Sequence, residues 1–543
     1  MAQAVSLLLL LLLLLLSLNS KLWVWQLSVH CIQYEALVYP ESSDPGISKR
    51  NADRKLEAFK HDFHHELKSG QRPKNVILFI GDGMGISTLT GARYTKAQNL
   101  GLAAGEVQLA WDDWPSVALV TTHSADRMTT DSGTSATAIM CGAKTIHEVI
   151  GIVGISECCI CQKLNSTNRV KSILIMAQHS GLSTGIVTTT RVTHATPAAA
   201  YAHIPHRDWE SSPHHSKDKK VLCPDIASQL LTEGIDFNVI LGGGYHNFYQ
   251  TPDAYTPATN GTRTDGRNLL KEWIDKQEMQ SRQYQLIFNR TALLKVNNSE
   301  TNYLLGLFSG SHMDYEIQRR DQPSLAEMTS VAIQILSRNF KGFLLLVEGG
   351  RIDHAHHTNM AKAALTDTLA MENAVLTAVR ETDPKETLIL VTADHSHGYG
   401  IAGYATRRQN IFDIDDTQEA DDGMPYLISS YFNGPAAKIN QTRENPLKPG
   451  RLDDLAMQQA LVPLSLATHT GEDVALYSTG PMHQLFHGTI DNTFIAYGTM
   501  YALCLEPYKN ASHCQQSKGT RNAKQQTISI VLQLSTLFWL QMN

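Results

Sequence analysis

The sequence predicts an α/β fold: a doubly wound, mostly parallel central sheet with helices on both faces and an inserted, crown-like region. One observation is a set of short runs that are apolar at almost every position, as in residues 75–80 and 342–347. Such runs are typical of strands covered on both faces. A second observation is that segments with helical spacing alternate with these runs along the chain. The hydrophobic share of 42% and the charged share of 18% indicate a globular protein with a large core.

The predicted elements follow from these two patterns. Apolar residues at three- and four-residue spacing predict helices, and apolar runs of strand length predict strands. The predicted helices cover residues 56–67, the first turns after Ser132, 172–180, 226–231, 324–337 and 361–380. The predicted strands cover residues 75–80, 185–190, 237–241, 342–347, 387–392 and 474–477. Residues of about 400–466 are looser and rich in glycine and charge, which we interpret as the insertion.

The two ends of the chain are expected to be targeting segments, which leaves residues 50–515 for the catalytic domain. An almost pure leucine run from Val5 to Leu18 predicts a signal peptide over about residues 1–20. Residues 516–543 form a polar spacer and an apolar tail, an order typical of a GPI-anchor signal. We therefore expect an extracellular protein held at the cell surface, with a soluble secreted form as the alternative.

The cysteines and glycosylation sequons fit this secretory route. Eight cysteines in a chain of this length predict local disulfides. Cys504 is expected to pair with Cys514, and Cys141 to be a buried free thiol. The partner of Cys223 stays open among Cys158, Cys159 and Cys161. The sequon asparagines are Asn165, Asn260, Asn289, Asn297, Asn440 and Asn510.

Asp131 and Ser132 precede the small, Ala-rich start of a predicted helix. Such a pair is usually a helix cap. The same backbone N–H groups and helix dipole also favour an anion, so Ser132 can alternatively be a nucleophile. A serine hydroxyl ionises too weakly to attack unaided, so this second interpretation requires an activator elsewhere in the chain.

Candidate activators follow the predicted strands. The carboxyl ends of parallel strands meet along one edge of a sheet, where ligands bind. Mixed nitrogen and oxygen donors suit zinc, whereas oxygen donors suit magnesium. Asp353 and His357 are four residues apart and share a face if helical. The metal-competent side chains that follow the strands are Asp82, His194, Thr196, Glu348, Asp394, His395 and, in a further group, His469.

These residues stand in motifs that resemble those of animal alkaline phosphatases, over about residues 75–508. The motifs are Gly81–Gly85, Asp131–Gly133, Arg191–Pro197, Glu348–His357, Thr392–His397 and Thr468–Asp473. The resemblance implies hydrolysis of phosphate monoesters with broad specificity at alkaline pH, through a phosphoserine on Ser132. It also implies a homodimer.

The resemblance further implies two zinc ions and one magnesium ion for each subunit. One zinc is implied at Asp353, His357 and His469, and the second at Asp82, Ser132, Asp394 and His395. Magnesium is implied at Asp82, Thr196 and Glu348. Arg207 matches the arginine that clamps phosphate, with Asp131 orienting it, and His194 lies in the outer shell of the magnesium. A calcium site is not expected, because Ser309 and Gln322 stand where vertebrate relatives have acidic residues.

The sequence also bears on other functions. A sulfatase requires a Cys-x-Pro-x-Arg string, which the sequence lacks. A phosphodiesterase of the same superfamily and a catalytically silent surface protein remain as alternatives. A net charge of −6 and a pI near 6.4 argue against a nucleic-acid-binding protein.

Overall fold

The computed structural model describes residues 45–62, 72–215, 220–232, 234–439 and 442–515. The predicted signal peptide, the C-terminal spacer and tail, and the end of the first predicted helix lie outside the described residues, as does the Asn440 sequon. None of the described helices combines the length and the apolar stretch that a membrane crossing requires.

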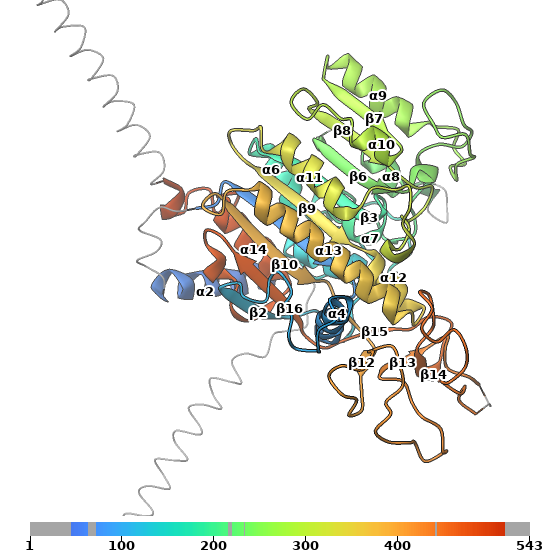
Figure 1. The fold of residues 1–543 in the computed structure, drawn as a ribbon. Helices are drawn as coiled ribbons and strands as arrows, with labels where there is room; N and C mark the ends of the chain where they lie inside the picture. The colour runs from blue at the N-terminus through green and yellow to red at the C-terminus, as the bar shows by residue number, and fades with distance from the viewer. Residues whose placement is uncertain (1–44, 63–71, 216–219, 233, 440–441, 516–543) are drawn as a thin grey trace, which may run out of the picture. The chain divides into compact units, whose positions relative to one another are not determined.

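A ten-stranded sheet forms the centre of the fold (Figure 1). From β10 to β7 every neighbouring pair is parallel, whereas β16 runs antiparallel to both of its neighbours. The sheet is therefore mostly parallel, as predicted. Its strands, in spatial order, are β17 (Gly488–Asp491), β2 (Ser116–Thr121), β16 (Val474–Thr479), β10 (Thr387–Ala393), β1 (Asn75–Gly81), β9 (Phe343–Gly349), β3 (Ser183–Arg191), β6 (Val239–Gly243), β8 (Tyr303–Leu307) and β7 (Tyr284–Ile287).

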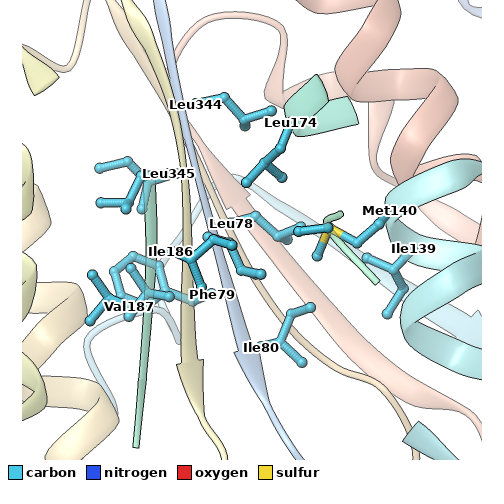
Figure 2. Close-up of a cluster of buried hydrophobic side chains, with 14 of the residues drawn as sticks. Leu78, Phe79, Ile80, Ile139, Met140, Leu174, Ile186, Val187, Leu344 and Leu345 are labelled. Atoms are coloured by element: carbon cyan, nitrogen blue, oxygen red, sulfur yellow. The ribbon is translucent and has the colours of Figure 1, made fainter. Parts of the chain in front are cut away.

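Helices cover both faces of this sheet. Figure 2 shows Ile139 and Met140 against Leu78 on one side of β1, with Phe79 pointing to the other side. The alternation follows from the two-residue period of a strand, and both sides are apolar because both are covered. The described α-helices are α2 (Pro45–Asp62), α4 (Ile86–Asn99), α5 (Ser132–Cys141), α6 (Ile173–His179), α7 (Ala195–Ala198), α8 (Ile226–Gln229), α9 (Leu269–Met279), α10 (Arg290–Leu293), α11 (Leu325–Leu336), α12 (Arg351–His357), α13 (Ala361–Glu381) and α14 (Thr493–Ala502).

The region expected to be an insertion forms a small sheet of its own. Its strands are β12 (Tyr399–Ile401), β13 (Ser429–Gly434) and β14 (Gln459–Pro463). A separate buried cluster, which includes Ile411 and Phe412, packs under them. The equivalence of this region to the crown of related enzymes stays a prediction. Two further ladders pair β4 (His214–His215) with β5 (Leu222–Cys223) and β11 (Ser396–His397) with β15 (His469–Thr470).

Two disulfides join described residues, Cys161–Cys223 and Cys504–Cys514. The first settles which of the three open candidates pairs with Cys223, and the second matches its prediction. Cys141 is a buried free thiol, as expected. Cys158 and Cys159 are left outside both disulfides.

Candidate active site

Helix α5 presents Ser132 at its first position. The Asp131 side chain caps the helix by accepting a hydrogen bond from the Gly133 N–H at 2.9 Å. Capping therefore belongs to Asp131, and the Ser132 hydroxyl is free for other contacts. Ser132 Oγ lies 3.2 Å from His395 Nε2 and 3.4 Å from Asp82 Oδ1. The serine is buried at the positive end of a helix, which favours an anionic oxygen.

Arg207 lies beside this serine and is tied to Asp131. Its Nη1 donates to Asp131 Oδ2 at 3.1 Å, and its Nη2 lies 3.2 Å from His194 Nε2. Burial alone would raise the pKa of Asp131, but the Arg207 charge and the Thr134 hydroxyl outweigh it and lower the pKa to about 2. Asp131 is thus an anion at neutral pH and can orient the guanidinium.

Asp82, Asp394 and His395 form a buried group around Ser132. His395 Nε2 lies 3.4 Å from Asp82 Oδ1 and 3.3 Å from Asp394 Oδ2. Burial raises the pKa of Asp394 to about 6, and burial together with the neighbouring carboxylates raises that of Asp82. Burial lowers the pKa of His395, so its imidazole is neutral and can donate a lone pair to a metal. Both carboxylates face the same imidazole nitrogen, and a bound cation would offset the cost of burying their charges.

Asp353, His357 and His469 form a second group. His357 Nε2 lies 3.3 Å from Asp353 Oδ2 and 3.2 Å from His469 Nε2. His357 Nδ1 and His469 Nδ1 face the carbonyl oxygens of Ala467 and Thr130. An Nδ1–H that donates to a carbonyl leaves Nε2 as the lone-pair atom, which is the usual arrangement of metal-binding histidines.

Glu348 belongs to a third, oxygen-rich group, near the group of Asp82, Asp394 and His395. The register pairs Glu348 with Ile80 in β1 and with Thr188 in β3, so Asp82 follows directly at the same edge. Glu348 Oε2 accepts hydrogen bonds from Thr188 and Thr190, at 2.5 and 3.1 Å. Burial raises the pKa of Glu348 to about 7. Within this group, three buried oxygens have no hydrogen-bond partner among the described residues: Glu348 Oε1, Asp82 Oδ2 and Thr196 Oγ1.

These unpartnered oxygens test whether the chain fits the implied metals. A buried carboxylate oxygen without a partner is costly, and a hard cation satisfies it. Thr196 lies in α7, directly after β3, at the same edge of the sheet. The donor set therefore fits magnesium here, and the two histidine-containing groups fit zinc.

Sequence reasoning missed three histidines at this edge. His397 Nε2 lies 2.5 Å from Asp353 Oδ1, and β11 places His397 opposite His469 in β15. His194 forms a cluster with His354 and His312, with ring centroids 5.2 Å from each. His354 and His397 stand within motifs that contain predicted metal ligands, so the sequence could have identified them as candidates. His312 lies in a loop after β8 and in no motif, so no sequence pattern was a reason to select it.

Comparisons with known proteins show which family this chain belongs to. The family model described as "Alkaline phosphatase" matches residues 73–505. The alkaline phosphatase of Gadus morhua is 43% identical over 445 residues, covering 80% of this chain and 92% of that protein. The tissue-nonspecific isozyme of alkaline phosphatase from Homo sapiens is 39% identical over 517 residues, covering 93% and 97% of the two chains.

A solved structure also resembles this fold. The alkaline phosphatase of Thermus thermophilus superposes with a TM-score of 0.58 at 26% identity, covering 80% of this chain and 92% of that chain. The chain therefore belongs to the alkaline phosphatase family and is a metal-binding enzyme that hydrolyses phosphate monoesters.

Proposed function

We propose that Ser132 is the nucleophile of this phosphomonoesterase and that it acts at a site for two zinc ions and one magnesium ion. The observation that carries the proposal is the placement of Ser132 Oγ. The atom lies at a helix N-terminus, 3.2 Å from His395 Nε2, and next to the Arg207–Asp131 pair. No general base from another part of the described chain has to be invoked.

The implied ligand sets are compatible with the geometry of the three groups. Asp353, His357 and His469 would hold one zinc. Asp82, Ser132, Asp394 and His395 would hold the other, and Asp82, Thr196 and Glu348 would hold magnesium. When bound, these ions would lower the pKa of the Ser132 hydroxyl and of water and would stabilise charge on the attacking and leaving oxygens.

The chain's own groups then bind and orient the phosphate. The Arg207 guanidinium binds two phosphate oxygens, held in direction by Asp131. Ser132 Oγ gives up its proton to solvent and attacks phosphorus in line with the leaving alcohol oxygen. The bond from phosphorus to that oxygen breaks, the alcohol leaves after taking a proton from solvent, and a phosphoserine forms. Water then attacks the phosphoserine, phosphate leaves, and Ser132 regains a proton. Because these groups contact the phosphate and not the alcohol, we expect broad monoester specificity.

Turnover of three esters tests this function. A phosphate monoester, a phosphate diester and a sulfate ester are supplied to the enzyme with and without a zinc chelator. We expect the monoester to be the best substrate and the chelator to abolish its turnover. A diester as best substrate would instead support the phosphodiesterase alternative, and no turnover at all would support a silent surface protein.

Ser132→Ala tests the nucleophile, with Ser135→Ala as the matched control. We expect Ser132→Ala to lose at least about 1,000-fold in kcat and to form no phosphoenzyme. Ser135 lies one turn later in α5, and its hydroxyl is within hydrogen-bond distance of the Asp131 and Ser132 carbonyl oxygens, at 3.0 and 3.3 Å, and of Asp394 Oδ2 at 3.3 Å. The hydroxyl has one proton to donate, so Ser135→Ala loses one donated hydrogen bond and should cost less than about tenfold. Retained activity in Ser132→Ala would rule out the serine as nucleophile.

We also propose a glycosylated extracellular enzyme that is held at the cell surface by a GPI anchor. The two disulfides support an oxidising compartment. The asparagines of the described sequons, Asn165, Asn260, Asn289, Asn297 and Asn510, are all exposed and thus accessible to glycosylation. Release of activity from intact cells by a phosphatidylinositol-specific phospholipase C would support the anchor, and activity only in the medium would contradict it.

A homodimer is proposed for this enzyme as well. Exposed large apolar side chains gather around β13 and β14, and Leu461 is 80% exposed. The others are Phe432, Met457, Val462, Leu464 and Leu466. Monomeric proteins rarely expose such a patch, which is typical of an association surface.

A further inference from the structure

Two neighbouring cysteines, Cys158 and Cys159, lie outside both disulfides of the described chain. Their Sγ atoms are 2.6 Å apart. Side chains of adjacent residues in extended backbone point to opposite sides. Here Cys159 adopts a left-handed conformation, with φ of 65°, and its N–H donates to Pro205 O at 2.9 Å. A left-handed conformation is uncommon outside glycine, and at Cys159 it occurs together with two sulfur atoms that face each other.

The spacing of the two sulfurs distinguishes between two kinds of site. Glu148 Oε2 lies 3.8 Å from Cys158 Sγ and 3.7 Å from Cys159 Sγ, so the three groups could be taken for a metal site. Two thiolates on one tetrahedral zinc, at about 2.3 Å from the ion, are held roughly 3.8 Å apart. The observed sulfurs are much closer than that, and a disulfide bond is about 2.0 Å long. The arrangement favours a bond between the sulfurs.

The surrounding segment is already oxidised. Cys161, two residues further on, is bonded to Cys223. A chain that acquires this disulfide folds in an oxidising compartment, and Cys159 is exposed there to oxidants. We propose that Cys158 and Cys159 form a vicinal disulfide by exchange with a disulfide of the glutathione or protein-oxidoreductase class. The two thiols lose two protons and two electrons, a new S–S bond forms, and the oxidant leaves as two thiols.

Such a bond should be more easily reduced than the other two. Adjacent Cα atoms across a trans peptide are about 3.8 Å apart. Ordinary disulfides join Cα atoms that are about 4.4–6.8 Å apart, and departures from this range store strain. The Cα atoms of both other pairs are 5.8 Å apart, within this range. Strained and exposed disulfides are the labile ones.

The position of the pair links its redox state to phosphate binding. The Glu148 side chain faces both sulfurs. The backbone oxygen of Glu148 accepts a hydrogen bond from the backbone N–H of Arg207 at 2.9 Å. The Glu148 N–H donates to Asp131 Oδ1 at 3.0 Å. Two thiols need more room than a disulfide and can donate to the Glu148 carboxylate. Reduction should therefore shift Glu148 and, through it, the Arg207–Asp131 pair, a consequence that rests on the proposed role of Arg207 in binding phosphate.

Mass spectrometry tests the bond itself. Enzyme purified from a secretory host is denatured, treated with iodoacetamide without reduction, digested and analysed. We expect Cys141 to be alkylated, and Cys158 and Cys159 to be unmodified with the mass of their peptide 2 Da below that of the dithiol, since two hydrogens are lost. Alkylation of both Cys158 and Cys159 in the unreduced enzyme would overturn the proposal, whatever the outcome for Ser132.

Graded reduction tests the link to phosphate. The enzyme is titrated with a phosphine reductant until mass spectrometry shows the vicinal bond open and Cys161–Cys223 intact. We expect the inhibition constant of inorganic phosphate to rise at least about threefold with little change in kcat, because only the clamp moves. The Cys158→Ser, Cys159→Ser double variant should show no response to the reductant. The link would be overturned if the inhibition constant of phosphate did not change when the Cys158–Cys159 bond opens. It would also be overturned if the double variant responded to the reductant in the same way.

Discussion

Asp131 and Ser132 divide two tasks that one residue could not perform together. Asp131 satisfies the Gly133 N–H and holds Arg207, so its carboxylate is fully used. The neighbouring hydroxyl of Ser132 stays available and faces Asp82 and His395. At this scale the chemistry depends on the direction of a single Cα–Cβ bond at the start of a helix.

At Arg207, replacement by lysine should separate charge from geometry. Lysine keeps the positive charge but lacks the planar fork that binds two oxygens. We expect Arg207→Lys to lower kcat/KM for a phosphate monoester by about 10- to 100-fold, the worth of one charged hydrogen bond. The inhibition constant of inorganic phosphate should rise in parallel. Exposed Arg169, replaced in the same way, is the control, and equal kinetics for the two variants would contradict the role of Arg207.

The proposed magnesium ligand Glu348 predicts that magnesium binding depends on pH. Burial raises its pKa to about 7 in the metal-free protein. Below pH 7 the carboxyl is protonated, and a cation must displace that proton, whereas above pH 7 it is already an anion. We expect the apparent magnesium affinity to fall up to about tenfold per pH unit from pH 7 to pH 5 and to level off above pH 7.

Calorimetric titration of magnesium into the magnesium-depleted enzyme at several pH values measures this dependence. Glu348→Gln should bind magnesium more weakly at pH 8 and show a flatter dependence below pH 7. Exposed Glu300→Gln is the control. A flat profile in the unmodified enzyme would contradict the proposed ligand role.

Helix α5 shows how an element is bounded so that it can present a site. It begins after the Asp131 cap and ends at Gly142, which has a φ of 69°. A Cβ added at Gly142 would lie 2.9 Å from a Tyr497 ring carbon in α14. The helix therefore depends on a glycine for both its left-handed end and its close packing against α14.

Two glycine variants test this end of the element. Gly142→Ala should destabilise the protein by about 2–4 kcal/mol, from left-handed strain and the clash with Tyr497. Gly101 has a similar φ of 70°, but a Cβ there meets nothing within 4 Å. Gly101→Ala should cost only about 1 kcal/mol. Unfolding in denaturant measures the loss of stability in both variants. Equal losses would mean that the contact with Tyr497 adds no cost at position 142.

The sheet edge is the element that assembles the site. Register places Gly81 beside Gly349 in β9 and beside Ala393 in β10, so Asp82 and Asp394 follow at the same level. Polar residues lie at or just beyond the end of each of these strands, with Glu348 the last residue but one of β9 and Asp82 and Asp394 directly after β1 and β10. Residues hundreds of positions apart thereby face one another with little loop between strand and ligand.

At the scale of the whole molecule, the exposed apolar patch around β13 and β14 predicts that two copies of the chain associate. Leu461→Glu places a charge in the middle of this patch and should convert the proposed dimer into monomers, as measured by light scattering during gel filtration. Met279 is 83% exposed at the end of α9 and lies outside the patch. Met279→Glu should therefore leave the dimer intact. A dimer that survives Leu461→Glu would place the interface elsewhere.

Much of the architecture could be predicted because the apolar run of a strand and the polar residue at its end lie within one short stretch of sequence. Continuous apolar runs predict β1, β9 and β10 within one or two residues of their bounds. β2 was not among the predicted strands, although its residues 117–120 form a short apolar run. The structure shows that this strand is covered on one face only, since apolar Val117 and Leu119 are exposed, and an apolar run does not reveal such one-sided burial.

The sequence by itself determined the fold class, the catalytic serine candidate and the motifs that bring metal-competent side chains to strand ends. These depend on residue type and short-range spacing, which a single chain displays directly. The tertiary structure decided which of three cysteines pairs with Cys223, that His397 joins Asp353, and that His312 reaches the His194 cluster. Contacts of this kind join segments from about 40 to over 100 positions apart. They depend on how loops close over the sheet edge, which no local pattern encodes.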